Sequence, residues 1–206
     1  MSLTGNPQLT ESGLDHPPNN PLFLLHQWLE TADRIGVNEP RGFVLSTISN
    51  SGRPSTRVVL LKASDQSGII FTTNQQSAKG KDLESNPCSA GTFWWRETIQ
   101  QVNFIGKVTQ LSKEISDKLF EERTREAKAV AAISKQSSLL TDEKELRDKI
   151  LKLIHSKSKI ERPKEWNAYY LILETIEFWQ GSKDRFHKRL RYDLVNNSWQ
   201  HQKLQP

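Results

Sequence analysis

The sequence predicts a mainly β, α+β fold, namely a closed or split β-barrel with flanking helices and a helical insert. Short segments rich in alternating or β-branched residues, separated by turn signals, occur toward both ends of the chain, which is typical of antiparallel strands in hairpins. Between them, residues 112–157 are dominated by Lys, Glu, Ala, Leu and Ile without a strand signal. Strands and helices do not alternate regularly, which argues against a doubly wound parallel sheet.

The N-terminal part combines an arm with one helix. Residues 1–19 are rich in Pro, Asn, Ser and Gly and show no periodicity, so we expect a flexible arm. Asn20 followed by Pro21 is a favourable helix start, apolar residues then recur at helical spacing, and Gly36 ends the helix. The chain therefore divides into this arm and a single domain over residues 20–206.

The remaining elements follow from changes of period along the chain. Strands are expected over 43–49, 56–62, 69–73, 89–95, 99–111, 168–174, 176–180, 186–194 and 199–203. A short helix is expected over 77–84. The insert is expected to hold two helices, about 113–127 and 142–156, the second behind an N-cap at Thr141. Asn196-Asn197 predicts a hairpin turn.

Composition and missing motifs exclude several classes of function. Lys and Arg number 29 against 24 Asp and Glu, and the acids are interleaved, so we expect no nucleic-acid binding. No apolar run is long enough to span a membrane and the first residues lack signal-peptide order, so we expect a cytoplasmic protein. The single cysteine excludes an intrachain disulfide, and the five histidines show no metal-ligand spacing. Dinucleotide-binding, P-loop and nucleophile-elbow motifs are absent.

The most distinctive polar cluster is the basic run over residues 183–191. If this run is extended, Arg185, His187, Arg189 and Arg191 share one face. Four such groups repel one another unless an anion or carboxylates lie against them. Two interpretations stay open: surface charges paired with acids of a neighbouring strand, or an anion pocket whose guanidinium groups suit phosphate or carboxylate.

Three weaker concentrations of polar residues accompany this run. The strand over 56–62 is apolar but bracketed by two cations, which alone is a common pattern. Residues 72–79 bring hydroxyls at a strand end to a helix start, which indicates either a phosphate cradle or a plain N-cap. Residues 94–101 carry two neutral amides into a strand, and buried amides need partners.

Five segments, in order, resemble the motifs of the pyridoxamine 5′-phosphate oxidase family. They are Arg57–Lys62 (RVVLLK), Phe71–Asn74 (FTTN), Ser134–Ser138 (SKQSS), Ile176–Gly181 (IEFWQG) and Arg185–Arg189 (RFHKR). The resemblance runs from about Pro21 to Pro206. It implies an FMN-binding split β-barrel, a homodimer with FMN at the subunit interface, and O2 as electron acceptor.

The resemblance also implies which residues contact the flavin. They are Arg57, Val58, Val59, Leu60, Leu61, Lys62, Thr72, Thr73, Lys79, Gln101, Gln136, Ser137, Trp179 and Arg189. Arg57, Lys79 and the two threonines suit the FMN phosphate, the two amides suit the edge of the ring, and Arg189 suits the negative charge of reduced flavin. The arginine that the family usually carries just before Lys79 is Ala78 here.

The substrate side follows the family only in part. Lys62, Arg123, Arg185 and His187 match substrate-binding positions, and no catalytic residue is assigned. The usual tyrosine and serine that grip a substrate phosphate are Leu119 and Ala127. Loss of these hydroxyl donors weakens phosphate binding and makes the pocket more apolar, which favours a flat ring system carrying carboxylates.

Within the family, the chain resembles the flavin oxidases of phenazine biosynthesis in residues 94–101, residues 184–193 and the terminal Leu-Gln-Pro. The resemblance implies oxidation of reduced phenazine carboxylic acid precursors toward aromatic phenazines, with O2 reduced to H2O2. Arg185 and His187 are expected to clamp a substrate carboxylate. Three alternatives stay open: a pyridoxamine/pyridoxine 5′-phosphate oxidase, a barrel that binds flavin without turnover, and a nucleic-acid-binding barrel.

Overall fold

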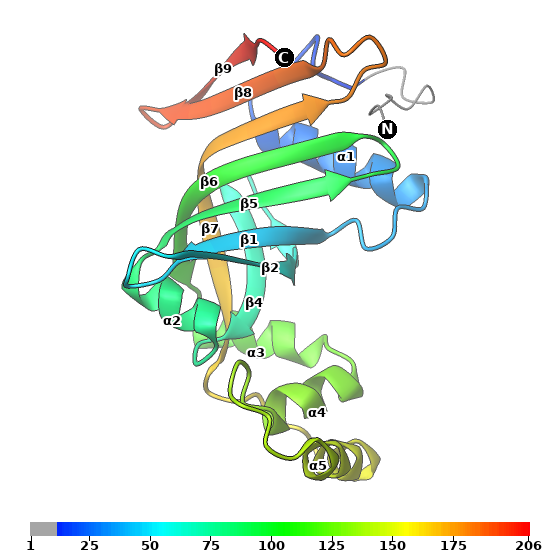
Figure 1. Ribbon diagram of the computed structural model, residues 1–206, viewed down its shortest axis with the longest axis vertical. Coiled ribbons are helices and arrows are strands. Elements are labelled where there is room, and N and C mark those ends of the chain that lie inside the picture. Colours follow the sequence, from blue (N-terminus) through cyan, green and yellow to red (C-terminus); the bar gives the residue numbers. More distant parts are fainter. Residues whose placement is uncertain (1–11) are drawn as a thin grey trace.

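The structure, a computed structural model, describes residues 12–206 and consists of one curled antiparallel sheet with five helices (Figure 1). The helices are α1 (Pro21–Arg34), α2 (Ala78–Ser85), α3 (Lys113–Glu121), α4 (Arg125–Ile133) and α5 (Glu143–His155). The strands are β1 (Gly42–Ile48), β2 (Pro54–Leu60), β3 (Ala63–Ser64), β4 (Gly68–Asn74), β5 (Cys88–Trp95), β6 (Gln100–Gln110), β7 (Trp166–Gln180), β8 (Lys188–Val195) and β9 (Ser198–Leu204). The predicted mainly β split barrel with a helical insert is confirmed.

The long strand β7 organises the sheet, whose order is β2-β1-β5-β6-β7-β4-β3, with β8 and β9 added beside β7. Its first half pairs with β4 and its second half with β8, while β6 follows it along the other side. The two strands that the sequence predicts here are therefore one. The pairing of β6 with β7 contains a bulge beside Gly106 of β6, which lets β7 bend. A Cβ on this glycine would lie 1.9 Å from the Ile172 carbonyl oxygen.

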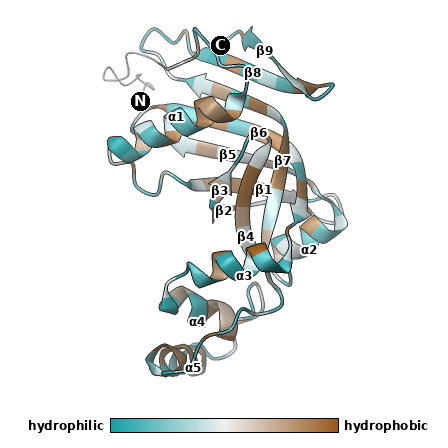
Figure 2. Cartoon of the chain, turned by 180° about the vertical axis from the view of Figure 1, so that it is seen from behind, coloured by the Kyte–Doolittle hydropathy of each residue, from teal (hydrophilic) through white to brown (hydrophobic). Residues whose placement is uncertain are grey.

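Helix α1 covers the inner face of the sheet (Figure 2). Asn20 caps it as predicted, its side chain accepting a hydrogen bond from the Leu22 backbone N at 2.8 Å. The Trp28 ring packs edge-on against Trp95 and Phe178, and all three side chains are buried in the main core. The inner face of the sheet is thus filled, and ligand chemistry is left to its outer face and its ends.

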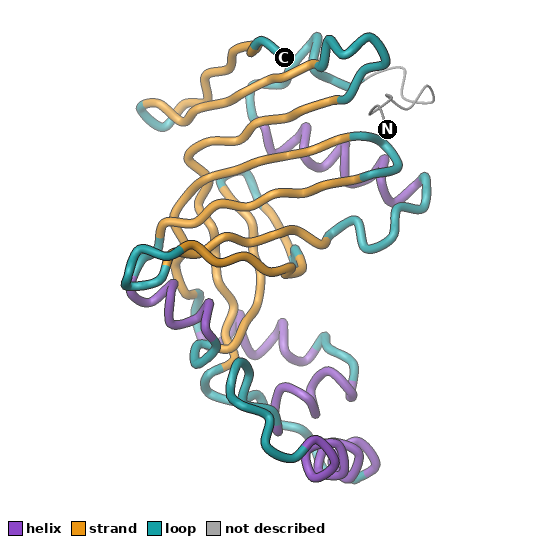
Figure 3. Tube along the Cα trace, viewed as in Figure 1, coloured by secondary structure: helices purple, strands orange, loops and turns teal. Residues whose placement is uncertain are grey.

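The insert differs from the prediction because it holds three helices rather than two (Figure 3). The expected helix over 113–127 breaks after Glu121, and α4 starts behind Thr124, whose hydroxyl accepts from the Ala127 backbone N. The break lets Phe120 of α3 and Ala129 of α4 join Trp166 in a second core cluster. The N-cap of α5 is Asp142 instead of Thr141. None of the helices in residues 12–206 combines the length and the apolar character needed to cross a membrane.

The described part of the predicted arm, residues 12–19, packs against the domain. Leu14 is only 2% exposed, and the Ser12 carbonyl accepts from the Trp28 indole at 2.7 Å. The Asp15 carboxylate bridges Lys188 and Lys203, at 2.5 and 3.3 Å. A segment without periodicity still docks when one apolar and one acidic side chain find partners far along the chain. The remainder of the expected arm, residues 1–11, lies outside the described residues.

Candidate functional site

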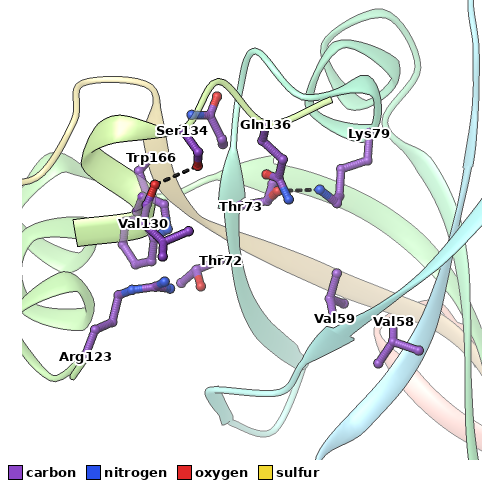
Figure 4. Close-up of a pocket in the computed structure, with 12 residues that line it drawn as sticks. Val58, Val59, Thr72, Thr73, Lys79, Arg123, Val130, Ser134, Gln136 and Trp166 are labelled. Atoms are coloured by element: carbon purple, nitrogen blue, oxygen red, sulfur yellow. Dashed lines mark hydrogen bonds between the residues drawn. The ribbon is translucent and has the colours of Figure 1, made fainter. Parts of the chain in front are cut away.

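A cavity of about 370 Å³ lies between the β2 and β4 strands, helix α2 and the helical insert (Figure 4). Its lining combines cations and hydroxyls with apolar groups. The lining residues are Val58, Val59, Thr72, Thr73, Asn74, Lys79, Arg123, Val130, Ala131, Ser134, Gln136 and Trp166. Three of the five family-like segments supply lining residues, and the helical insert forms the opposite wall.

Lys79 is a buried cation with hydroxyl partners. Ser77 caps α2, so Lys79 sits in the first turn of the helix and is 7% exposed. Its Nζ donates to Thr73 Oγ1 at 2.9 Å and to Ser77 Oγ at 3.3 Å. Burial, with the nearby charge of Arg57 adding to it, lowers the pKa of Lys79 to about 8. Within residues 12–206 no carboxylate lies at ion-pair distance, so the site is suited to accept an anion.

Arg57 lies beside Lys79 and is held by a polar network. Its guanidinium donates to Thr47 Oγ1 at 2.7 Å and lies 3.8 Å from the Asp82 carboxylate. The same carboxylate accepts from Thr47 at 2.7 Å and from Ser55 at 3.2 Å. Burial lowers the pKa of Arg57, against the opposing effect of Asp82. Asp82 thus balances Arg57, whereas Lys79, which lines the cavity, keeps an uncompensated positive charge.

Arg123 stands on the other side of the cavity from Lys79 (Figure 4). Its Nη2 donates to the Ala127 carbonyl at 3.0 Å, and the guanidinium stacks over Trp166 at 5.0 Å from the ring centre. Its Nε is buried without a hydrogen-bond partner, and burial lowers its pKa. A buried donor without a partner is costly, so this position is suited to an acceptor group on a ligand.

The loop before α5 contacts α2 through Ser137. The Ser137 hydroxyl accepts from the Ala78 backbone N at 3.2 Å, and its own backbone has a φ of +69°. Gln136 lines the cavity beside it. The Ser137 hydroxyl therefore accepts from one backbone N–H at the start of α2. This N–H belongs to Ala78, the residue whose place is usually taken by an arginine in the family.

A second cavity, of about 640 Å³, lies at the opposite end of the sheet, between the β7–β8 loop, the C-terminus and the docked arm. It is lined by Leu14, Asp15, Phe186, His187, Lys188, Arg189, Lys203, Leu204, Gln205 and Pro206. The His187 ring lies 4.7 Å from the Trp179 ring, and its Nδ1 accepts from the Ser182 backbone N at 3.1 Å. Of the predicted substrate residues, only His187 lines this cavity.

The predicted common face of the basic run is correct for only two of its four members. β8 begins at Lys188, and Arg185 lies in the preceding turn with a φ of +66°, so Arg185 and His187 do not follow the strand alternation. Arg189 pairs with Glu177 of β7 at 2.8 Å, and Arg191 pairs with Asp193 at 2.8 Å. The predicted pairing with acids of a neighbouring strand therefore holds for Arg189, whereas Arg191 pairs with an acid of its own strand.

The predicted flavin residues fall into two groups that lie apart within one chain. The first, around the 370 Å³ cavity, includes Val58, Val59, Thr72, Thr73, Lys79 and Gln136. The second, Gln101, Trp179 and Arg189, forms a cross-strand row on the outer face, and Gln101 pairs in register with Trp179 as Trp179 does with Arg189. Thr72 on β4 is in register with Ala168 on β7, and Trp179 lies 11 residues further along β7 (179 − 168), or about 36 Å of extended strand. Lys62 is exposed and lines neither cavity.

The outer face between the two groups carries exposed apolar side chains. They are Val58 (67% exposed), Ile105 (52%), Trp94 (43%), Leu60 (42%) and Val44 (38%). Val44 on β1 is in register with Val58 on β2, so the apolar side chains adjoin across these two strands, whereas the neighbour of Val44 on β5 is Thr92. Exposed apolar side chains gathered on one face mark a site of contact with a protein, a membrane or a ligand. We call these five residues the apolar outer face.

Comparisons with known proteins identify the family. Residues 29–156 match the pyridoxamine 5′-phosphate oxidase domain, and residues 166–206 match the C-terminal dimerisation region of pyridoxine 5′-phosphate oxidase. The chain belongs to the pyridoxamine 5′-phosphate oxidase family, whose members are flavin-dependent oxidoreductases. A 16% identical FMN-binding protein of this type from Nostoc punctiforme shares the fold with a TM-score of 0.74.

Individual relatives add detail. The chain is 36% identical over 205 residues to the dihydrophenazinedicarboxylate synthase of Pseudomonas chlororaphis, covering 100% of this chain and 92% of the relative. It is 38% identical over 190 residues to the pyridoxine/pyridoxamine 5′-phosphate oxidase of Mannheimia succiniciproducens, covering 91% of this chain and 90% of that one. The crystal structure of PhzG from Burkholderia lata, in complex with tetrahydrophenazine-1-carboxylic acid, superposes with a TM-score of 0.93 at 36% identity, covering 96% and 98%.

Sequence reasoning missed two groups that shape the first cavity. Asp82, the carboxylate beside Arg57, lies on α2, and no local signal links it to a side chain of β2. Trp166, which stacks on Arg123, begins β7 after a polar linker and has no local signal for such a contact. Within residues 12–206 no group of three or more His, Cys, Asp and Glu side chains is arranged to hold a metal ion.

Proposed function

We propose that this protein is a cytoplasmic, homodimeric, FMN-dependent oxidase that dehydrogenates reduced phenazine carboxylic acid precursors, with O2 as electron acceptor. The observation that carries the substrate is the pairing of full-length similarity to dihydrophenazinedicarboxylate synthases with Leu119 and Ala127 at positions where phosphate-binding hydroxyls are expected. Arg123 is left as a cation without hydroxyl companions, which suits a carboxylate on a flat ring.

The first cavity fits the phosphate of FMN. Lys79 has hydroxyl partners but no carboxylate, and the charge of Arg57 lies nearby. The Thr73 hydroxyl and the start of α2 add donors, so a dianion there would relieve the repulsion between the two cations. Ala78 removes one cation that the family usually supplies. FMN, when bound, supplies a two-electron acceptor that O2 reoxidises with formation of H2O2. The residues of this chain bind and orient it.

A homodimer explains the separation of the two groups of flavin residues. A second copy related by a two-fold axis and packed on the apolar outer face would bring Gln101, Trp179 and Arg189 of one subunit to the first cavity of the other. The match of residues 166–206 to a dimerisation region supports this arrangement. Arg189 would then reach the flavin with its charge already balanced by Glu177.

On the substrate, the residues of this chain act by positioning. Arg185 and His187 would bind a carboxylate of the reduced phenazine and hold its ring against the flavin, while Lys62 and Arg123 extend the positive surroundings. Aromatisation of the product favours the reaction, so little acid–base catalysis is required. Retention of Lys62 and Arg123 keeps pyridoxine 5′-phosphate oxidation as the second candidate.

Turnover measurements discriminate between the two candidates. We expect tetrahydrophenazine-1-carboxylic acid, mixed anaerobically with the FMN-loaded protein, to bleach the visible flavin band, and O2 to restore the band with formation of H2O2. Pyridoxine 5′-phosphate is expected to bleach the band far more slowly at the same concentration. The reverse order of rates would make the protein a vitamin oxidase. Absence of bleaching by either compound would leave a flavin-binding barrel without this chemistry.

Lys79→Met is expected to weaken FMN binding and to stabilise the flavin-free protein. Loss of one charge-assisted bond lowers the affinity by about 10- to 150-fold. Because the pKa of Lys79 is lowered to about 8 on folding, the unfolded chain binds the extra proton more strongly. The free energy of unfolding of the wild type therefore rises with pH above about 8, as Lys79 loses its proton. Below that pH the wild type carries the free-energy cost of burying a charged lysine, and the methionine variant does not.

The pH dependence of FMN binding checks the same residue. Wild-type affinity is expected to fall as Lys79 loses its proton above about pH 8, whereas the affinity of Lys79→Met stays flat. Quenching of FMN fluorescence gives the dissociation constants, and thermal unfolding of the flavin-free protein gives the stabilities. Lys81→Met, at an exposed position of the same helix, is the matched control. Equal FMN affinities for wild type and Lys79→Met would place the phosphate elsewhere.

A further inference from the structure

The β7–β8 loop is organised by side chains that were not assigned a role in binding. The Asp184 carboxylate accepts from the Phe186 backbone N at 2.9 Å and from the Ser182 hydroxyl. The Arg185 backbone N donates to the Ser182 carbonyl at 3.2 Å and closes a tight turn. These bonds hold the pKa of Asp184 below its usual range. One oxygen of Asp184 thus accepts both of the hydrogen bonds that organise the turn.

Arg185 sits inside this turn in a conformation that arginine seldom adopts. Its φ of +66° falls in the left-handed region, which is unfavourable for side chains with a Cβ. The bonds that Asp184 accepts on both sides of Arg185 compensate for this strain. Within residues 12–206, no acid pairs with the Arg185 guanidinium. The loop therefore presents a strained, exposed and unpaired cation, which is the pattern of a prepared binding group.

The same turn fixes the proton of His187. The Ser182 backbone N donates to Nδ1 at 3.1 Å, and a backbone N–H can only donate. Nδ1 must then carry its lone pair, so the neutral ring has its single proton on Nε2. The Trp179 ring at 4.7 Å limits rotation of the imidazole. His187 therefore offers an N–H donor, rather than a lone pair, to the second cavity that it lines.

The base of the loop is fixed independently of Asp184. The Gly181 backbone N donates to the Ile99 carbonyl at 2.9 Å, and the Gln180 amide donates to the Thr98 carbonyl at 3.1 Å. A Cβ on Gly181 would lie 2.2 Å from Ile99 Cγ2, so glycine is required at this contact. Removal of the Asp184 carboxylate should consequently loosen the tip of the loop while its anchorage to the β5–β6 hairpin stays.

We propose that Asp184, through Ser182, is a positioning residue that keeps Arg185 in its left-handed conformation and His187 in the Nε2–H form, so that both donate to one carboxylate of the substrate. The proposal rests on the proposed function, because it takes the ligand to be a ring carboxylate. It assigns His187 the role of a hydrogen-bond donor, so His187 does not accept a proton from the substrate at Nδ1.

The test compares Asp184→Ala with Asp184→Asn in the FMN-loaded protein. The asparagine carbonyl oxygen can accept the same two hydrogen bonds, so this variant should behave like the wild type. For Asp184→Ala, we expect the KM for tetrahydrophenazine-1-carboxylic acid to rise about tenfold, with flavin content and melting temperature unchanged. Lys183→Ala, a neighbouring exposed position, is the control.

The nitrogen-15 spectrum of histidine-labelled protein at about pH 8, where an ordinary imidazole is neutral, gives a readout that a merely structural role would not move. His187→Gln assigns the resonances. We expect an unprotonated Nδ1 and a protonated Nε2 in the wild type and in Asp184→Asn, and a mixture of both tautomers in Asp184→Ala. A protonated Nδ1 in the wild type, or an unchanged tautomer and KM in Asp184→Ala, would overturn the proposal. Failure of the wild type to oxidise the substrate would refute the proposed function, and the spectrum would still decide the tautomer.

Discussion

Val44→Glu is expected to convert the protein into a monomer that no longer retains FMN. Val44 lies on β1 within the apolar outer face, in register with Val58 and Thr92. A carboxylate buried in the proposed dimer interface would lose its hydration without gaining a partner. Because each flavin site is expected to draw residues from both subunits, loss of the dimer should remove flavin binding altogether.

Light scattering after gel filtration gives the mass, and the visible absorption of the same peak gives the flavin content. Phe23→Glu is the matched control, since Phe23 is exposed on α1, on the opposite side of the sheet from the apolar outer face. We expect this control to stay dimeric and yellow. A folded Val44→Glu monomer that binds FMN as tightly as the wild type would show that one chain suffices for the flavin site.

Leu119→Tyr combined with Ala127→Ser is expected to strengthen binding of pyridoxine 5′-phosphate by about 10²- to 10⁴-fold, because two hydroxyl donors to a dianion are restored. Leu119 lies near the end of α3 and Ala127 near the start of α4, on either side of the break that contains Arg123. At the same time the surroundings of Arg123 become more polar, so the affinity for the reduced phenazine should fall.

Dissociation constants for pyridoxine 5′-phosphate, measured through the perturbation of the flavin spectrum, check this expectation. Leu119→Phe with Ala127→Ser is the comparison that keeps the ring and omits the phenol, and it should recover only part of the gain. If the double variant binds the phosphate no better than the wild type does, Arg123 does not mark the phosphate end of a vitamin site, and the argument from Leu119 and Ala127 fails.

The strands were the most predictable part of the fold, because one buried face imposes a period of two. β1, β4 and β9 lie within about one residue of their predicted ranges, and Asn196 and Asn197 have φ values of 51° and 61°, as a tight hairpin turn requires. The insert was less predictable. Helical periodicity continues across residues 122–124, and only the capping tendency of Thr124 signals the break that packs Phe120 on Trp166.

The candidate site was predictable as a set of residues but not as an arrangement. Lys79 and Thr73 are close in the chain and meet through local geometry. The contact of Asp15 with Lys188 and Lys203 joins the two ends of the chain and has no local signal. The extended pattern expected at Arg185 failed because Asp184 stabilises a turn, which a strand-period argument does not consider.

The continuity of β7 has a genetic consequence. The strand starts at Trp166, in the wall of the first cavity, and carries Trp179 near its other end, beside His187. In the proposed dimer, the two ends of each β7 strand would thus belong to different catalytic centres. Two null alleles, one damaged at Lys79 and one at Arg189, should complement each other when co-expressed, since a mixed pair of chains contains one centre built entirely from intact parts.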